Sequence, residues 1–237
     1  MSGTTSLGRQ ALAEFLGSAG LVTVVIGSGI AAQRLSPDDT GLQLLENALA
    51  TGAGLVALIL AFGPVSGGHF NPVITLADRF FGGLPNRSAA LYLPAQLVGG
   101  VAGAVLANLM FDLPAVTISG KDRSAAGLWL SEALATFGLV VLVFALVRAG
   151  RAALAPFAVG AYITAAYWWS SSTSFANPMI DLARTLSDTF AGIAPSSVPM
   201  FLLAQLVGGA VGVAAVAVLY PTVGAVADDV VVPREPA

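Results

Sequence analysis

Long apolar stretches alternate with short polar segments along almost the whole chain. A helix needs about 20 apolar residues to cross a bilayer, so each stretch predicts one membrane-spanning helix. The six predicted spans are residues 10–32, 44–64, 88–110, 126–148, 152–170 and 196–220. Little chain remains for a domain outside the membrane. We therefore predict an all-α membrane protein in which residues 1–237 form a single domain, with a flexible C-terminal tail at 221–237.

The chain contains an internal repeat. Residues 95–100 read AQLVGG and recur letter for letter at 204–209, while FNPVI at 70–74 is matched by ANPMI at 176–180. The two pairs occur in the same order, which indicates duplication of a unit of three spans. A unit with an odd number of spans inserts upside down in its second copy, so we expect an inverted 3+3 repeat. The two predicted units are residues 10–110 and 126–220.

Each unit carries an Asn-Pro pair at the start of a short apolar run. Asn is a favoured N-cap, and Pro is tolerated at the first helical position because its missing N–H has no partner there. The runs that follow the two pairs are too short to span a bilayer. Such backbone is tolerated at membrane depth only inside protein or beside a water-filled cavity. We therefore expect six transmembrane helices and two re-entrant half-helices, one from each face.

The two half-helices are expected to meet head to head near the membrane midplane. Each N-terminus carries about half a positive charge, and each Asn side chain adds an amide donor. A neutral hydroxylated molecule gains hydrogen bonds there, whereas a cation meets positive potential after losing hydration. The preceding segments, 67–68 and 170–174, are expected to be extended, with carbonyl groups toward the vestibules. The predicted midplane residues of this pore are Asn71, Pro72, Asn177 and Pro178.

The composition agrees with a membrane protein and excludes several kinds of site. Charged residues make up 10% of the chain and hydrophobic residues 56%, and the mean hydropathy is +0.84. With no cysteine and one histidine, we expect no catalytic set, no metal site and no cofactor. The net charge of -3 argues against nucleic acid as a partner.

These motifs give the chain a resemblance to the major intrinsic protein superfamily of aquaporins and aquaglyceroporins. Residues 66–77, SGGHFNPVITLA, resemble that family's first signature, with Val73 where alanine is usual. The second signature usually reads Asn-Pro-Ala-Arg, and this chain has Met179 and Ile180 after its second Asn-Pro. The resemblance implies an aquaporin-like fold, passive transport of small neutral solutes across the lipid bilayer, and a homotetramer.

The resemblance also implies an outer constriction formed by four residues. They lie in the second span, in the fifth span, three residues before the second Asn and three residues after it. The water channels have a ring with an aromatic residue, His and Arg, and the glycerol channels keep the Arg with two aromatic residues. This chain has neither set. At the four positions it has Thr51, Tyr167, Ser174 and Ile180, with Ala165 as the alternative in the fifth span.

The region from Tyr167 to Gly192 resembles a bacterial subgroup associated with arsenic resistance. That likeness implies arsenite and methylated trivalent arsenicals as solutes, beside water, glycerol and other polyols. Ile180 removes a fixed cation with five donors, and Thr51 in place of an aromatic residue is expected to widen the ring.

Three polar residues are expected to support the half-helix loops. Glu14 and Glu132 lie within predicted spans, where ionisable side chains are costly and usually face the protein interior. The resemblance implies that they accept backbone N–H groups of the loops, and a proton-relay role is the alternative. His69, the single histidine, is expected to form hydrogen bonds in the inner vestibule beside Asn71.

Arg184 lies one helical turn beyond Ile180. We expect it to point to the outer mouth and to pair with Asp181 or Asp188, because a solvated cluster is the usual environment of such charges. The alternative is that Arg184 supplies a cation to the pore and influences permeation.

Six spans place both termini on one side of the membrane, and the basic residues indicate which side. With the termini inside, the cytoplasmic basic residues are Arg9, Arg79, Arg87, Arg148, Arg151 and Arg234, and the outer ones are Arg34, Lys121, Arg123 and Arg184. We expect a multi-pass protein of a bacterial inner membrane with both termini in the cytoplasm.

A secondary transporter is the competing hypothesis, because inverted repeats with broken helices also build transporters. Coupling to ions normally requires ionisable groups at mid-membrane, where the predicted spans offer Glu14 and Glu132. An enzyme is not expected.

Overall fold

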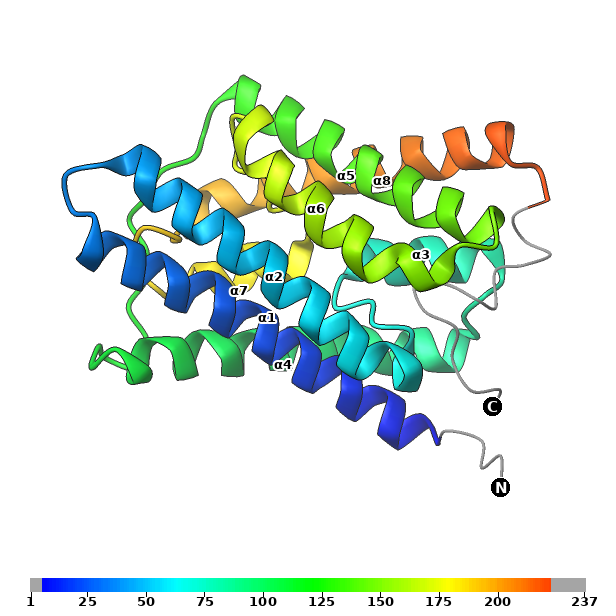
Figure 1. Cartoon of the computed structure of the whole chain (residues 1–237), viewed down its shortest axis with the longest axis horizontal. Helices are drawn as coiled ribbons and strands as arrows, with labels where there is room; N and C mark the ends of the chain where they lie inside the picture. Colours follow the sequence, from blue (N-terminus) through cyan, green and yellow to red (C-terminus); the bar gives the residue numbers. More distant parts are fainter. Residues whose placement is uncertain (1–5, 223–237) are drawn as a thin grey trace.

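The computed structural model describes residues 6–222, so the predicted tail lies outside the described residues except for Pro221 and Thr222. Within this range the chain forms eight α-helices (Figure 1). They are α1 (Leu7–Leu35), α2 (Thr40–Ser66), α3 (Pro72–Phe81), α4 (Asn86–Met110), α5 (Ala126–Arg148), α6 (Ala155–Trp169), α7 (Pro178–Arg184) and α8 (Val198–Leu219). Short 3₁₀ helices precede α6 at Ala152–Leu154 and α8 at Pro195–Ser197.

The six predicted spans correspond to α1, α2, α4, α5, α6 and α8. Five of these are long and apolar enough to cross a membrane, the last being counted from Pro195 to Leu219. The fifth predicted span, 152–170, is formed by a 3₁₀ turn and α6, and α6 with its 15 residues extends only about 22 Å at 1.5 Å per residue. The preceding 3₁₀ turn adds about 6 Å, which brings the segment close to the roughly 30 Å hydrocarbon core.

Helices from equivalent positions of the two repeat units make equivalent contacts. In the first unit α1 packs along α4, and in the second α5 packs along α8. Small residues allow both approaches. A methyl group built on Gly99 of α4 would overlap the backbone carbonyl oxygen of Phe15, and one built on Gly208 of α8 would overlap that of Ala133. The repeated AQLVGG blocks therefore lie where the long helices of each unit are in close contact.

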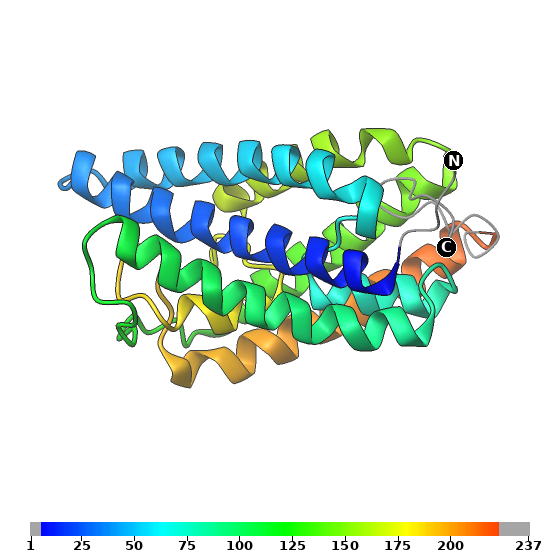
Figure 2. The ribbon, with the colours of Figure 1, turned by 90° about the horizontal axis from the view of Figure 1, so that it is seen from below.

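The short helices α3 and α7 lie in opposite halves of the molecule along its long axis (Figures 1 and 2). Each begins with proline at the first helical position after an asparagine cap. The side chain of Asn71 accepts a hydrogen bond from the backbone N–H of Val73 at 2.9 Å, and Asn177 accepts one from Met179 at 3.1 Å. At the far end of α3, Gly82 adopts φ 90°, a left-handed conformation that ends the helix.

The described chain starts and finishes at one end of the bundle. Figure 1 shows the beginning of α1 and the end of α8 at the same end of the long axis, as six crossings require. The predicted all-helical fold with two half-helices is confirmed.

Candidate functional site

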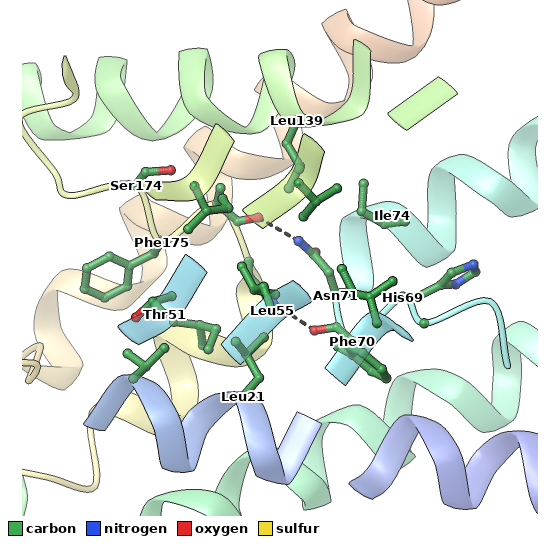
Figure 3. A pocket seen from close by; sticks show the side chains of 18 of the residues that line it. Leu21, Thr51, Leu55, His69, Phe70, Asn71, Ile74, Leu139, Ser174 and Phe175 are labelled. Carbon is green, nitrogen blue, oxygen red and sulfur yellow. Dashed lines mark hydrogen bonds between the residues drawn. The ribbon is translucent and has the colours of Figure 1, made fainter. Parts of the chain in front are cut away.

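The N-termini of the two half-helices meet at the centre of the molecule. The side-chain amide of Asn71 donates to the backbone carbonyl of Ala176 at 2.8 Å, and that of Asn177 donates to the carbonyl of Phe70 at 2.8 Å. Figure 3 shows these two hydrogen bonds as dashed lines. Each NH₂ group uses one hydrogen in this way and keeps the other for a further partner. Two positive helix ends are thereby held face to face.

Both asparagines line one cavity of about 60 Å³. At roughly 15 Å³ for each water site, it has room for about four water molecules. Most of the wall is apolar, formed by Leu, Val and Ile side chains of α1, α2, α5 and α6. Polar groups occur at the middle and toward the two ends. In Figure 3, Thr51 and Ser174 lie at one end, His69 at the other, and Asn71 between them.

The chain enters each half-helix in a left-handed conformation, not the extended one that the sequence suggested. Phe70 has φ 47° and its repeat equivalent Ala176 has φ 46°, and Gly68 and Ser174 are likewise positive at 66° and 49°. Only glycine adopts such angles freely, so the non-glycine residues carry backbone strain. The expectation of extended chain was wrong, because the backbone must turn sharply to bring both the asparagine side chain and the carbonyl group of the residue before it to the pore.

Two buried carboxylates hold these strained loops. Glu14 accepts hydrogen bonds from the backbone N–H groups of His69 at 3.0 Å and Phe70 at 2.8 Å. Glu132 accepts from those of Phe175 and Ala176, both at 2.8 Å. A glutamine completes each arrangement: Gln96 donates to Glu14 at 2.7 Å and Gln205 donates to Glu132 at 2.6 Å. These charge-assisted bonds keep the strained backbone in place.

Replacing Glu14 or Glu132 by glutamine should reduce folding yield more than it changes selectivity. A glutamine loses charge-assisted bonds worth about 1.5–3 kcal/mol each, and its NH₂ group would face N–H donors. The measurement is the yield of monodisperse protein in detergent and its thermal unfolding. Glu46→Gln is the control, because among residues 6–222 Glu46 accepts one hydrogen bond, from the Ser36 hydroxyl at 3.0 Å, and none from a backbone N–H. Glutamine variants that fold normally but lose transport driven by a proton gradient would favour the transporter hypothesis.

His69 lines the cavity at the end opposite Thr51, and polar side chains of α3 lie beside both of its ring nitrogens. Its Nδ1 lies 3.1 Å from the hydroxyl of Thr75, and its Nε2 lies 3.2 Å from a carboxylate oxygen of Asp78. The ring also packs edge-on against Tyr92, with centroids 5.5 Å apart. The imidazole therefore has a fixed orientation beside Asn71.

The four residues counted for the constriction all line the cavity: Thr51, Tyr167, Ser174 and Ile180. The hydroxyls of Thr51 and Tyr167 are 3.2 Å apart. Ala165, the alternative in the fifth span, is exposed on α6 and is not among the lining residues. The cavity end near Thr51 thus has hydroxyl groups on one part of its wall and the hydrocarbon of Ile180 on another.

The expectation that Arg184 pairs with an aspartate in a solvated cluster is wrong. Arg184 is only 2% exposed and lines the cavity, and its Nε donates to the backbone carbonyl of Ala191. Asp181 instead accepts from Gln205 at 3.1 Å, and Asp188 accepts from the N–H of Gly120 at 3.0 Å. Arg184 turns inward because the ring of Phe175 and the carbonyl of Ala191 replace water around its guanidinium.

Sequence reasoning missed several buried charged residues around the pore. Asp78 and Asp181 are fully buried on the half-helices, so Glu14 and Glu132 are not the only acids inside the described part of the molecule. Arg123, in the loop before α5, is 9% exposed. For Arg184 the spacing from Ile180 had given a place at the pore as the alternative, because residues four apart share a helix face.

Comparison with known proteins places the chain among channel proteins. The model of the family described as Major intrinsic protein matches residues 1–215. "Aquaglyceroporin AqpS" of Rhizobium meliloti (strain 1021) is 50% identical over 202 residues, which cover 85% of this chain and 86% of that protein. "Aquaporin Z" of Brucella melitensis biotype 1 is 28% identical over 215 residues, covering 84% of this chain and 92% of its own length.

A solved structure shares the fold. The aquaglyceroporin from Plasmodium falciparum superposes with a TM-score of 0.70 over 92% of this chain and 99% of its own, at 20% sequence identity.

Proposed function

The chain belongs to the major intrinsic protein family, and on that premise we propose that its pore conducts glycerol and other polyols, arsenite and methylated trivalent arsenicals as well as water. It is a passive membrane channel for small uncharged solutes and not an enzyme. The name of the Rhizobium relative, an aquaglyceroporin, supports the extension of the solute range to glycerol.

The observation that carries the proposal is the chemistry of the cavity end near Thr51. Ile180 stands where the family usually has arginine, and it lines the same cavity as Thr51, Tyr167 and Ser174, which carry hydroxyl groups. A polyol or a trivalent arsenic hydroxide has hydroxyl groups on one part of its surface and less polar atoms on another. The hydroxyl groups of such a solute can form hydrogen bonds with the polar part of the wall, while its less polar atoms contact Ile180.

The centre of the pore is assigned one contribution to the rejection of ions. Asn71 and Asn177 bring two positive helix ends together between apolar walls, where a cation has lost most of its hydration. A neutral solute meets no such penalty and gains the free N–H of each amide. The assigned midplane residues are Asn71, Pro72, Asn177 and Pro178, and the assigned loop supports are Glu14, Glu132 and His69.

The membrane arrangement belongs to the same proposal. We assign residues 1–237 to one channel domain with repeats at 10–110 and 126–220, in a bacterial inner membrane with both termini cytoplasmic. The bacterial relatives support the choice of membrane, and the excess of arginine at the end that carries the termini supports the orientation. A homotetramer is proposed from membership of the family.

The test is stopped-flow light scattering on proteoliposomes without any ion gradient. Purified protein should raise glycerol permeability at least about tenfold above empty liposomes, equivalent to about 1.4 kcal/mol of barrier, and should also raise water permeability. Uptake of urea and arsenous acid is measured in the same vesicles. A protein that passes water alone contradicts the proposed solute range, and a requirement for an ion gradient contradicts the passive channel.

A further inference from the structure

Equivalent positions of the two half-helices carry different chemistry. Asp78 lies seven residues after Asn71 and contacts His69, two residues before it, at 3.2 Å. The same positions around Asn177 are Arg184 and Phe175. There the contact is a cation–π interaction, with the guanidinium carbon of Arg184 3.5 Å from the ring centroid of Phe175. One end of the pore therefore has an acid beside its histidine, and the other has a cation beside its aromatic ring.

The guanidinium of Arg184 has donors to spare. Among residues 6–222 its hydrogen bond is the one from Nε to the carbonyl of Ala191, and no ion pair joins it to a carboxylate. Because the side chain lines the cavity, its two terminal NH₂ groups can serve a molecule inside the pore. The buried hydroxyl of Ser174, 3% exposed and also lining the cavity, has no hydrogen-bond partner in this part of the chain either.

A second arginine, Arg123, contacts the ring of Phe175. Arg123 lies with its guanidinium carbon 4.9 Å from the centroid of Phe175, and its Nε donates to the carbonyl of Gly192 at 3.1 Å. The pKa of the nearby Lys121 is lowered to about 8, first by burial of its ammonium group and then by the positive charges of Arg123 and Arg184. The ring of Phe175 is thus contacted by arginines from two segments, the loop before α5 and the end of α7.

We propose that Arg184, seated on the ring of Phe175, is the specificity-determining cation of the constriction, where its NH₂ groups and the Ser174 hydroxyl bind oxygen atoms of the passing solute. This inference rests on the proposed function. Arg184 lies four residues after Ile180, about one 5.4 Å turn along the same helix face. The charge is therefore retained beside the pore, while the lumen at Ile180 is free of a guanidinium. Such an arrangement repels cations and still admits a solute larger than water.

The experiment compares parent, Arg184→Gln, Arg184→Lys and the control Arg87→Gln in proteoliposomes. Arg87 is an exposed arginine at the start of α4, away from the cavity. Stopped-flow scattering gives the ratio of glycerol to water permeability, and a fluorescent dye reports the leak of K⁺ and protons. Arg184→Gln should lower the glycerol-to-water ratio about threefold or more and raise the cation leak about tenfold, because both donors and charge are lost.

The lysine variant separates charge from hydrogen bonding. Arg184→Lys should keep the cation leak low, since the charge remains, but should lower the glycerol ratio, because an ammonium has neither the planar fork of donors nor the same stacking on Phe175. A purely structural role predicts no such split. The control Arg87→Gln should behave as the parent in both measurements.

The possible outcomes separate a failure of the proposed function from a failure of the proposed role of Arg184. If the parent passes no glycerol, the proposed function fails. If the parent passes glycerol and Arg184→Gln leaves both the glycerol ratio and the cation leak unchanged, only the role of Arg184 is overturned. Should Arg184→Gln fail to fold, Arg184→Lys and Phe175→Leu decide: both should lower the glycerol ratio, and parent-like ratios in both overturn the proposal.

Discussion

Ile180→Arg is expected to reduce glycerol flux about tenfold or more while reducing water flux less than about threefold, a difference in barrier of at least about 0.7 kcal/mol. Ile180 lines the same cavity as Thr51 and Tyr167, whose hydroxyls are 3.2 Å apart. An arginine there replaces the hydrocarbon surface with a long side chain and a full charge, and it narrows the passage. A larger solute loses both space and apolar contact, whereas a water molecule fits the narrower passage and finds new donors.

The measurement is stopped-flow light scattering with glycerol and with an impermeant osmolyte on the same vesicles. Ile180→Leu is the matched control, because it keeps volume and polarity and should retain parent ratios. The new arginine would also stand one turn from Arg184, and like charges at this spacing cost a few tenths of a kcal/mol, so folding must be checked by thermal unfolding. If glycerol flux is unchanged in a folded Ile180→Arg protein, Ile180 does not belong to the constriction.

The largest expected effect on stability is at Gly208. Gly208→Ala should destabilise the protein by about 2–3 kcal/mol, because overpacking of a close helix contact carries such a cost. The new methyl group would overlap the backbone carbonyl oxygen of Ala133 in α5, and a backbone atom within a helix cannot turn aside as a side chain can. The helices α5 and α8 would have to separate, which would disturb the support that Gln205 gives to Glu132.

Thermal unfolding in detergent checks this prediction, with a fall in Tm of roughly 5–10 °C expected at about 2–4 °C per kcal/mol. Gly8→Ala is the matched control, since nothing lies within 4 Å of a methyl group built there and alanine favours the helix. Equal Tm values for the two variants would mean that α5 and α8 do not approach each other as the structure shows.

Much of the architecture followed from the pattern of residues. Six apolar stretches and a repeated pair of motifs led to the inverted repeat, and each Asn-Pro pair led to a short capped helix. The spacing of the family's constriction residues selected Thr51, Tyr167, Ser174 and Ile180, with Ala165 as the alternative in the fifth span. The first four lie around one cavity, and their roles in selectivity remain predictions.

The errors concern groups whose surroundings come from distant parts of the chain. The loops before Asn71 and Asn177 contain left-handed residues. Glu14 and Glu132, on other helices, compensate the strain because they accept hydrogen bonds from the backbone N–H groups of these loops. A sequence pattern gives no sign of that compensation. Asp78 and Asp181 were not recognised as buried for a similar reason. Other segments of the chain surround these two short helices, so the pattern of residues within each helix does not reveal which of its side chains are buried.

The sequence by itself determined the number of spans, the inversion of the second unit and the meeting of the two asparagines. Apolar length and helix capping depend on neighbouring residues, and the inversion depends only on an odd number of spans in each unit. Tertiary structure decided where Arg184 lies. A guanidinium at the end of a seven-residue helix can reach either water or the lumen, and the choice depends on Phe175 and Ala191, which fold beside it. Its position is a balance between lost hydration and gained contacts, and that balance exists only once the half-helices are packed together.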